Sequence, residues 1–175
     1  MKTIKAVTLV GNPKIGSRTL KVAEEVTRQI VSRLGSQGLT VSNATVDVAK
    51  LGSRLLEWNN EAVKTVLQRV AECDLLVIAS PVYKASYTGV LKLLLDQLPF
   101  EGLAGRIAVP VMVAAAPIHA LAIEAHFRPL LVELGASCPT RGLMILESKL
   151  DELSPAVAQW LDGELAVLAP LFTNR

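Results

Sequence analysis

The chain has 175 residues, of which 51% are hydrophobic and 19% charged, and its formal net charge is +2. This length allows one substantial core but is short for two, so we expect residues 1–175 to form a single domain. The composition excludes a disordered chain and indicates a sheet covered on both faces or apolar surface buried in a homo-oligomer. Lys and Arg residues are scattered along the sequence, which argues against nucleic-acid binding.

Membrane insertion and thiol chemistry are also disfavoured. Apolar runs such as Leu75–Ala79 and Ile107–Ala116 are far shorter than the roughly 20 residues that span a bilayer, and no signal segment opens the chain. Cys73 and Cys138 lie far apart without a CxxC motif, so we interpret them as ordinary buried thiols in a reducing compartment. We therefore expect a soluble, cytoplasmic protein.

The first half of the chain alternates predicted strands and helices. Ile4–Val10 is rich in β-branched residues and is followed by Gly11, so it predicts a buried strand that ends in a turn. Apolar residues from Leu20 to Leu34 recur at the helical period, and Gly35 predicts the end of that helix. The next expected elements are a strand within 39–48 and a helix that begins at Asn59 or Asn60 and continues through Val70.

The second half repeats this alternation. Asp74–Ser80 is apolar on both alternating faces, as a central parallel strand should be, and Pro81 predicts its end. Ser154 and Pro155 predict the N-cap and first residue of a last helix that reaches Leu168. Between them we expect a helix over 87–98, a strand over 106–113, a helix over 119–134 kinked at Pro129, and a strand over 140–146. Such a pattern predicts a parallel sheet wound on both faces, with ligands at the loops that leave the carboxyl ends of strands.

The first of these loops, Gly11–Thr19, has the chemistry of a phosphate site. Because it joins a strand to a helix, backbone N–H groups and the positive end of the helix dipole point outward together. Ser17 and Thr19 add hydroxyl groups, and Lys14 and Arg18 add positive charge. One phosphate monoester fits this set; the alternative is that a hydroxyl only caps the helix and the cations are solvated.

Two related motifs are excluded at this loop. Gly11 and Gly16 have the Walker spacing, but Ser17 and Arg18 stand where a Lys and a Ser or Thr are required. A GxGxxG dinucleotide fingerprint is absent as well. The ligand that this loop still fits is a mononucleotide with a terminal phosphate.

The second and third loops are suited to a flat ligand. Tyr83 and Tyr87 are the only tyrosines of the chain, and both lie in the loop 80–89, where they could stack on or border a planar ring. The loop 114–120 is small and apolar and would allow such a ring to approach the backbone. His119 and His126 have no partner carboxylate or metal-ligand spacing, so we interpret them as surface or helix-end residues.

The segment SPVYKASYTGVLKLLLDQLP at 80–99, followed by LAGR at 103–106, closely resembles the NAD(P)H-dependent FMN reductases of the flavodoxin-like superfamily. The resemblance is strongest to the group that supplies reduced flavin to alkanesulfonate monooxygenases, and it extends weakly from Gly11 to Leu130. It implies an α/β, flavodoxin-like three-layer sandwich with a five-stranded parallel sheet. It also implies FMN as cofactor and NADPH or NADH as reductant.

The resemblance further implies the roles of individual residues. Ser17, Arg18 and Thr19 would hold the FMN phosphate, residues 81–85 would line the flavin ring, and the third loop would meet its pyrimidine edge. Tyr87 would match a tyrosine in a distorted helix turn at a subunit interface of a homo-dimer or tetramer, where it would govern flavin exchange. The complete set of expected cofactor-binding residues is Asn12, Lys14, Ser17, Arg18, Thr19, Pro81, Val82, Tyr83, Lys84, Ala85, Ala115 and Ala116, with no metal and no catalytic side chain.

Two positions depart from the family pattern. Asn12 replaces the serine that usually follows the first glycine, and Ala115-Ala116 replaces a Gly-Gly pair. Alanine disfavours positive φ and adds methyl groups, so we expect flavin to bind more weakly or in a shifted orientation.

The function that these observations favour is FMN reduction by NAD(P)H, with reduced flavin passing to a flavin-dependent monooxygenase. Hydride transfer between two cofactors requires positioning and exclusion of water rather than a protein acid or base. Three alternatives stay open: a reductase of quinones, azo dyes or metal oxyanions that keeps FMN bound, a non-catalytic electron carrier, and a binding protein that has lost flavin.

Overall fold

The computed structural model describes residues 3–173, which form one five-stranded sheet and the helices around it. The strand order is β2-β1-β3-β4-β5, and every neighbouring pair is parallel. The strands are β1 (Ile4–Val10), β2 (Val41–Asp47), β3 (Leu75–Pro81), β4 (Ile107–Ala114) and β5 (Leu143–Leu146). The predicted α/β, flavodoxin-like fold with a five-stranded parallel sheet is confirmed.

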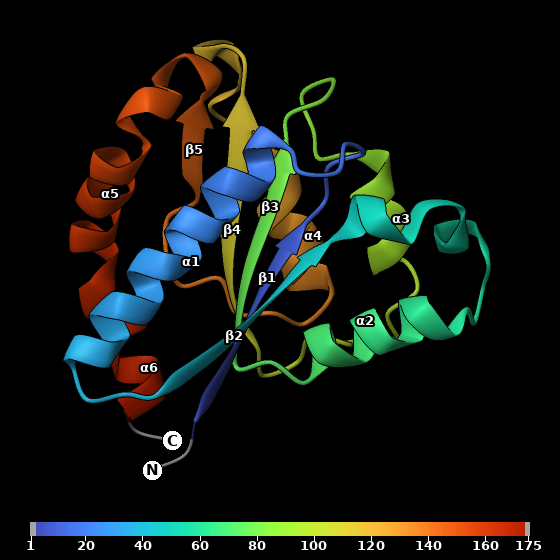
Figure 1. Cartoon of the computed structure of the whole chain (residues 1–175), viewed down its shortest axis with the longest axis horizontal. Coiled ribbons are helices and arrows are strands. Elements are labelled where there is room, and N and C mark those ends of the chain that lie inside the picture. Colours follow the sequence, from blue (N-terminus) through green and yellow to red (C-terminus); the bar gives the residue numbers. More distant parts are fainter. Residues whose placement is uncertain (1–2, 174–175) are drawn as a thin grey trace.

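Helices cover both faces of the sheet (Figure 1). One face carries α1 (Arg18–Ser36), α5 (Leu153–Leu168) and α6 (Pro170–Thr173), and the other carries α2 (Glu61–Ala71), α3 (Gly89–Leu95) and α4 (Arg128–Glu133). Each helix layer forms a separate apolar core with the sheet, because alternate strand residues point to opposite faces. β3 is buried along its whole length, as its apolar sequence predicted.

Short helices of other types occupy several connections. The 3-10 segments are η1 (Val48–Leu56), η2 (Pro117–His119) and η4 (Glu147–Glu152), and η3 (Ile123–Phe127) is a π-helical turn. None of the helices in the described residues is long and apolar enough to cross a bilayer.

Most expected element boundaries agree with the structure within a few residues, and two helix ends differ. Gly35 lies inside α1, which continues to Ser36, so the glycine does not end the helix. α5 begins at Leu153, which places Ser154 in the first turn and makes the predicted N-cap wrong. The reason is a tertiary contact: the carbonyl and hydroxyl oxygens of Ser154 accept hydrogen bonds from the Gln29 side chain of α1 at 2.9 and 3.3 Å.

The helix expected over 119–134 is divided into η2, η3 and α4. Pro129 lies in the first turn of α4, directly after helical residues of the preceding turn. The irregularity comes earlier than the expected kink, in the π-helical turn that directly precedes α4.

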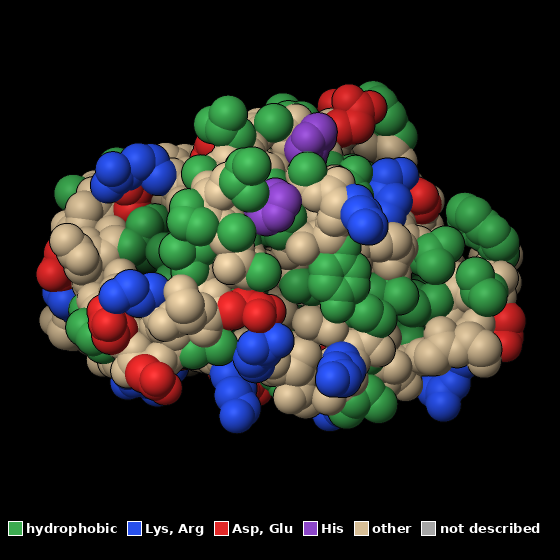
Figure 2. Space-filling view, turned by 90° about the horizontal axis from the view of Figure 1, so that it is seen from above, with side chains coloured by type: hydrophobic (Ala, Val, Ile, Leu, Met, Phe, Trp, Pro, Cys, Tyr) green, Lys and Arg blue, Asp and Glu red, His purple; other side chains and the backbone are tan. Residues whose placement is uncertain are grey.

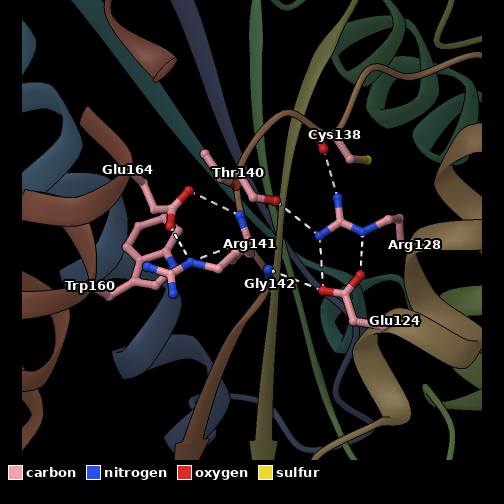
Figure 3. Close-up of polar contacts among 8 residues, drawn as sticks. All are labelled: Glu124, Arg128, Cys138, Thr140, Arg141, Gly142, Trp160 and Glu164. Carbon is pink, nitrogen blue, oxygen red and sulfur yellow. Dashed lines mark hydrogen bonds and ion pairs between the residues drawn. The ribbon is translucent and has the colours of Figure 1, made fainter. Parts of the chain in front are cut away.

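Two arginine–glutamate pairs fix the connection from α4 to β5 (Figure 3). Arg128 pairs with Glu124 and donates hydrogen bonds to the carbonyl oxygens of Cys138 and Thr140 at 2.7 and 2.9 Å. On the other side, Arg141 pairs with the buried Glu164 of α5 at 2.6 Å. The start of β5 is therefore held between the helix layers of both faces.

Candidate functional site

The carboxyl ends of all five strands meet at the upper edge of the sheet in Figure 1, and Figure 2 looks down on that edge. The loops after β1, β3 and β4, which the sequence singled out, are neighbours there because these strands are adjacent in the sheet. Hydrophobic side chains and charges of both signs are interspersed on this face (Figure 2). The edge has no strongly charged field of one sign, so recognition there depends on local groups.

The loop after β1 leads into the N-terminus of α1. Ser17 is the N-cap, and its Oγ accepts a hydrogen bond from the Leu20 N–H at 3.2 Å. The backbone N–H groups of Arg18 and Thr19 have no acceptor within the described part of the chain, as is usual in a first helical turn. Ser17 therefore caps the helix while the N–H groups of Arg18 and Thr19 stay available to an anion, so capping and anion binding are compatible and not alternatives.

Asn12 and Thr19 brace this loop internally. The Asn12 Nδ2 donates to Thr19 Oγ1 at 3.0 Å, and Asn12 Oδ1 accepts from the Lys14 N–H at 2.9 Å. Asn12 and Thr19 are buried, whereas the Lys14 side chain is exposed. The asparagine that departs from the family pattern therefore shapes the loop through both ends of its amide.

Two carboxylates that were not predicted from the sequence, those of Asp47 and Glu147, contact the same loop. The N–H group of Gly16, whose φ is +65°, donates to Asp47 Oδ2 at 3.1 Å. Glu147 pairs with Arg18, with Oε2 and Nη2 3.1 Å apart. Asp47 ends β2 and Glu147 directly follows β5, so both are acidic residues at carboxyl ends of predicted strands, and that position was the available signal.

The loop after β3 projects as a tight hairpin turn, visible above β3 in Figure 1. Tyr83 and Ser86 exchange backbone hydrogen bonds of 2.8 and 3.1 Å. Between them, Lys84 and Ala85 have φ of +50° and +64°, which is the left-handed region that side chains disfavour. Pro81 is buried at the end of β3, while Tyr83, Lys84 and Ala85 are exposed.

The resemblance matched Tyr87 to a tyrosine in a distorted helix turn of family members, and in this chain Tyr87 lies outside the helices. It lies in the extended approach to α3, whereas the π-helical turn is Ile123–Phe127. The two features meet in space, because the rings of Tyr87 and Phe127 lie 5.9 Å apart between centroids. Val82, in the same loop, donates its N–H to the Val113 carbonyl oxygen at 2.8 Å and so ties the turn to β4.

The loop after β4 carries the alanine pair without backbone strain. Ala116 is extended, with φ −144° and ψ 151°, and Ala115 also lacks a positive φ. Ala115 is exposed and Ala116 half-buried. The alanines therefore fit the backbone of this loop, and any effect on a ligand comes from their methyl groups.

The described residues contain neither a metal-binding cluster nor a reactive thiol. Within residues 3–173, no group of three or more His, Cys, Asp and Glu side chains is arranged to hold a metal ion. Burial raises the pKa of the Cys73 thiol to about 12 and raises that of Cys138 as well, so both resist forming the nucleophilic thiolate.

The family model for NADPH-dependent FMN reductases matches residues 4–151, which include all three loops. The chain therefore belongs to the NADPH-dependent FMN reductase family. This assignment confirms the resemblance drawn from residues 80–99. It also agrees with the expected cofactor, FMN, and with a nicotinamide nucleotide as reductant.

Individual relatives agree with this assignment. The chain is 29% identical over 150 residues to an FMN reductase (NADPH) of Escherichia coli K12, covering 84% of this chain and 75% of the relative. It is 30% identical to the NADH-dependent FMN reductase SfnF of Pseudomonas putida, with 97% and 93% covered. Among solved structures, the apo form of an NADH:FMN oxidoreductase, EMOB, superimposes with a TM-score of 0.78 at 27% identity, covering 94% of this chain and 90% of that chain.

Proposed function

We propose that this member of the family oxidises NADPH or NADH, reduces FMN, and releases the reduced flavin to a partner flavin-dependent monooxygenase. The observation that carries the proposal is that two adjacent strands, β1 and β3, are followed by helix N–H groups without acceptors in the described residues and by an exposed aromatic turn. An anion site next to a surface for a planar ring suits a phosphorylated flavin.

The start of α1 fits the phosphate of FMN. Arg18 and Thr19 offer backbone N–H groups that have no acceptor among residues 3–173, and Ser17 adds a hydroxyl group beside them. Arg18 also offers a largely exposed guanidinium group, which can form charge-assisted hydrogen bonds to phosphate oxygens. Lys14 adds a second cation, while Asn12 holds the loop in shape.

The two following loops fit the flavin ring. Val82, Tyr83, Lys84 and Ala85 would line one side of it, and the small residues Ala115 and Ala116 would let its edge approach the backbone of the third loop. FMN, when bound, supplies the atom that accepts hydride from the nicotinamide. The protein contributes orientation and exclusion of water, for which no side-chain acid or base is needed.

We further propose that the whole chain acts as one domain and assembles as a homo-dimer or tetramer. Large apolar side chains are exposed on the described surface, among them Trp58, Phe100, Ile118 and Leu121. A monomer would leave them in water, whereas a homo-oligomer could cover them. Light scattering after size-exclusion chromatography tests this; a monomer at micromolar concentration would overturn it.

The decisive experiment follows NADH and NADPH oxidation by desalted protein, with and without added FMN. Activity that requires added FMN supports an exchanging reductase. Full activity with stoichiometric bound flavin would favour a reductase that keeps FMN and passes electrons to another acceptor. No oxidation of either nucleotide under any flavin condition would overturn the proposal. In parallel, Arg18→Ala should weaken FMN binding about tenfold through the lost charge-assisted bonds, measured by quenching of flavin fluorescence.

A further inference from the structure

The guanidinium group that we assign to the FMN phosphate already has a carboxylate partner. Arg18 Nη2 and Glu147 Oε2 are 3.1 Å apart, and the two side chains are 61% and 35% exposed. Arg18 opens α1 and Glu147 opens η4, so the pair joins the segments that follow β1 and β5. The contact lies at the carboxyl edge, beside the phosphate-binding N–H groups.

The charges around the first loop balance one another. Lys14 and Arg18 are the cations, and Asp47 and Glu147 are the carboxylates that reach the loop or its arginine. Asp47 is buried and accepts hydrogen bonds from two backbone groups, the N–H of Gly16 and that of Ala49, so its role is to hold the chain. Glu147 differs, because within the described residues Arg18 is the partner of its carboxylate.

Glu147 is held at this position by the fold. η4 continues directly from β5, and β5 pairs with β4 from Leu143 to Leu146. The preceding segment is fixed by the Arg128 and Arg141 contacts drawn in Figure 3. The anchored end of β5 therefore places the Glu147 carboxylate beside Arg18.

We propose that Glu147 lowers the affinity for FMN by competing with its phosphate for Arg18. The inference rests on the proposed function, because it takes residues 17–19 as the phosphate site. A phosphate dianion must displace the Glu147 carboxylate from Arg18 or share the arginine with it, and two negative groups on one arginine repel each other. Part of the favourable Arg18–phosphate interaction is thus offset, which suits an enzyme whose reduced flavin has to leave.

The test compares Glu147→Gln with a matched control, Asp162→Asn. The control also neutralises one carboxylate paired with an arginine of α1, since Asp162 Oδ1 lies 2.6 Å from Arg33 Nη2. Arg33 is about 22 Å farther along the helix at 1.5 Å per residue. Both variants change the net charge equally, so only the local effect differs between them.

We expect Glu147→Gln to lower the FMN dissociation constant about 1.5- to fivefold, the range of an exposed ion pair. The dissociation constant of riboflavin, which lacks the phosphate, should stay unchanged, and Asp162→Asn should change neither. In the Arg18→Ala background, Glu147→Gln should lower the FMN dissociation constant less than it does in the natural chain, because the competing pair is already broken.

The possible failures are distinguishable. If Arg18→Ala weakens FMN but Glu147→Gln leaves it unchanged or weakens it, the role of Glu147 is overturned while the phosphate site stands. Equal tightening of riboflavin and FMN would also overturn it, because the effect would not involve the phosphate. If Arg18→Ala leaves FMN affinity unchanged, the phosphate assignment itself fails, and the inference fails with it.

Discussion

The Thr88 hydroxyl donates a hydrogen bond to the Gly11 carbonyl oxygen at 2.6 Å, across 77 positions of the sequence. The same oxygen, Oγ1, accepts the Leu91 N–H at 3.3 Å and so caps α3. Thr88 is buried, and its own N–H donates to Ser80 Oγ at 3.0 Å. One side chain therefore couples the loop after β1 to the loop after β3, the two loops proposed to hold the phosphate and the flavin ring.

Replacing Thr88 with Val should destabilise the protein and weaken FMN binding together. The substitution keeps the shape but leaves the buried Gly11 carbonyl without its hydroxyl donor and the α3 cap unmade, a loss of about 2 kcal/mol. Urea unfolding measures the stability, and fluorescence titration measures FMN affinity. Thr88→Ser keeps the hydroxyl group and should retain most of both; an equal loss in the two variants would argue against the hydrogen bond as the cause.

Gly11→Ala should cost about 3 kcal/mol of stability, because overpacking would force α3 away from β1. An added Cβ at Gly11 would stand 2.3 Å from Leu91 Cβ, where no atom can be accommodated. Gly35→Ala is the matched control: it lies within α1, meets no atom within 4 Å, and should stabilise the protein by up to about 1 kcal/mol. Opposite shifts in the urea midpoint are expected, and a neutral Gly11→Ala would contradict the close packing described here.

Replacing an alanine with glycine should have opposite effects in the loops after β3 and β4. Ala85→Gly relieves a left-handed residue at φ +64° and should stabilise the protein by about 1 kcal/mol. Ala116→Gly, at φ −144°, adds backbone freedom to an extended residue and should destabilise by about 0.5–1 kcal/mol. The melting temperatures of the two variants measure both changes in stability. Shifts of the same sign would mean that Lys84 and Ala85 are not held in a strained turn.

Acid stability should depend on Glu25, whose carboxylate accepts hydrogen bonds from Arg28 and Gln29 at 2.7 Å. The Arg28 bond is the main cause that lowers the pKa of Glu25 from 4.5 to about 2. Because the folded-state pKa lies below the unfolded value, the contribution is fully present above pH 4.5 and disappears as the pH falls through about 2.

Glu25→Gln should therefore be less stable than the natural chain at neutral pH, with a difference that shrinks between pH 4.5 and 2. Urea midpoints of both proteins at pH 7, 4.5 and 3 measure this dependence. A difference that stays constant over this range would show that Glu25 contributes by packing and not by charge.

The order of strands and helices along the chain could be predicted from the residues, because the hydrophobic repeat of each element is a local property that needs no tertiary contact. The uninterrupted apolar run of β3 predicted a central strand, and the parallel arrangement then placed three loops at one edge. The residue types of the first loop, with Ser17 as the cap of α1, predicted an anion site from local chemistry alone.

How these parts contact one another could not be predicted, because the contacts form between distant segments of the folded chain. Asp47 and Glu147 reach the first loop from β2 and from the end of β5, and Thr88 joins Gly11 from α3. The π-helical turn at Ile123–Phe127 likewise has no local signal of the strength of a hydrophobic period. The contacts of Asp47, Glu147 and Thr88 join segments that are distant in sequence, so their partners are defined only once the sheet has formed.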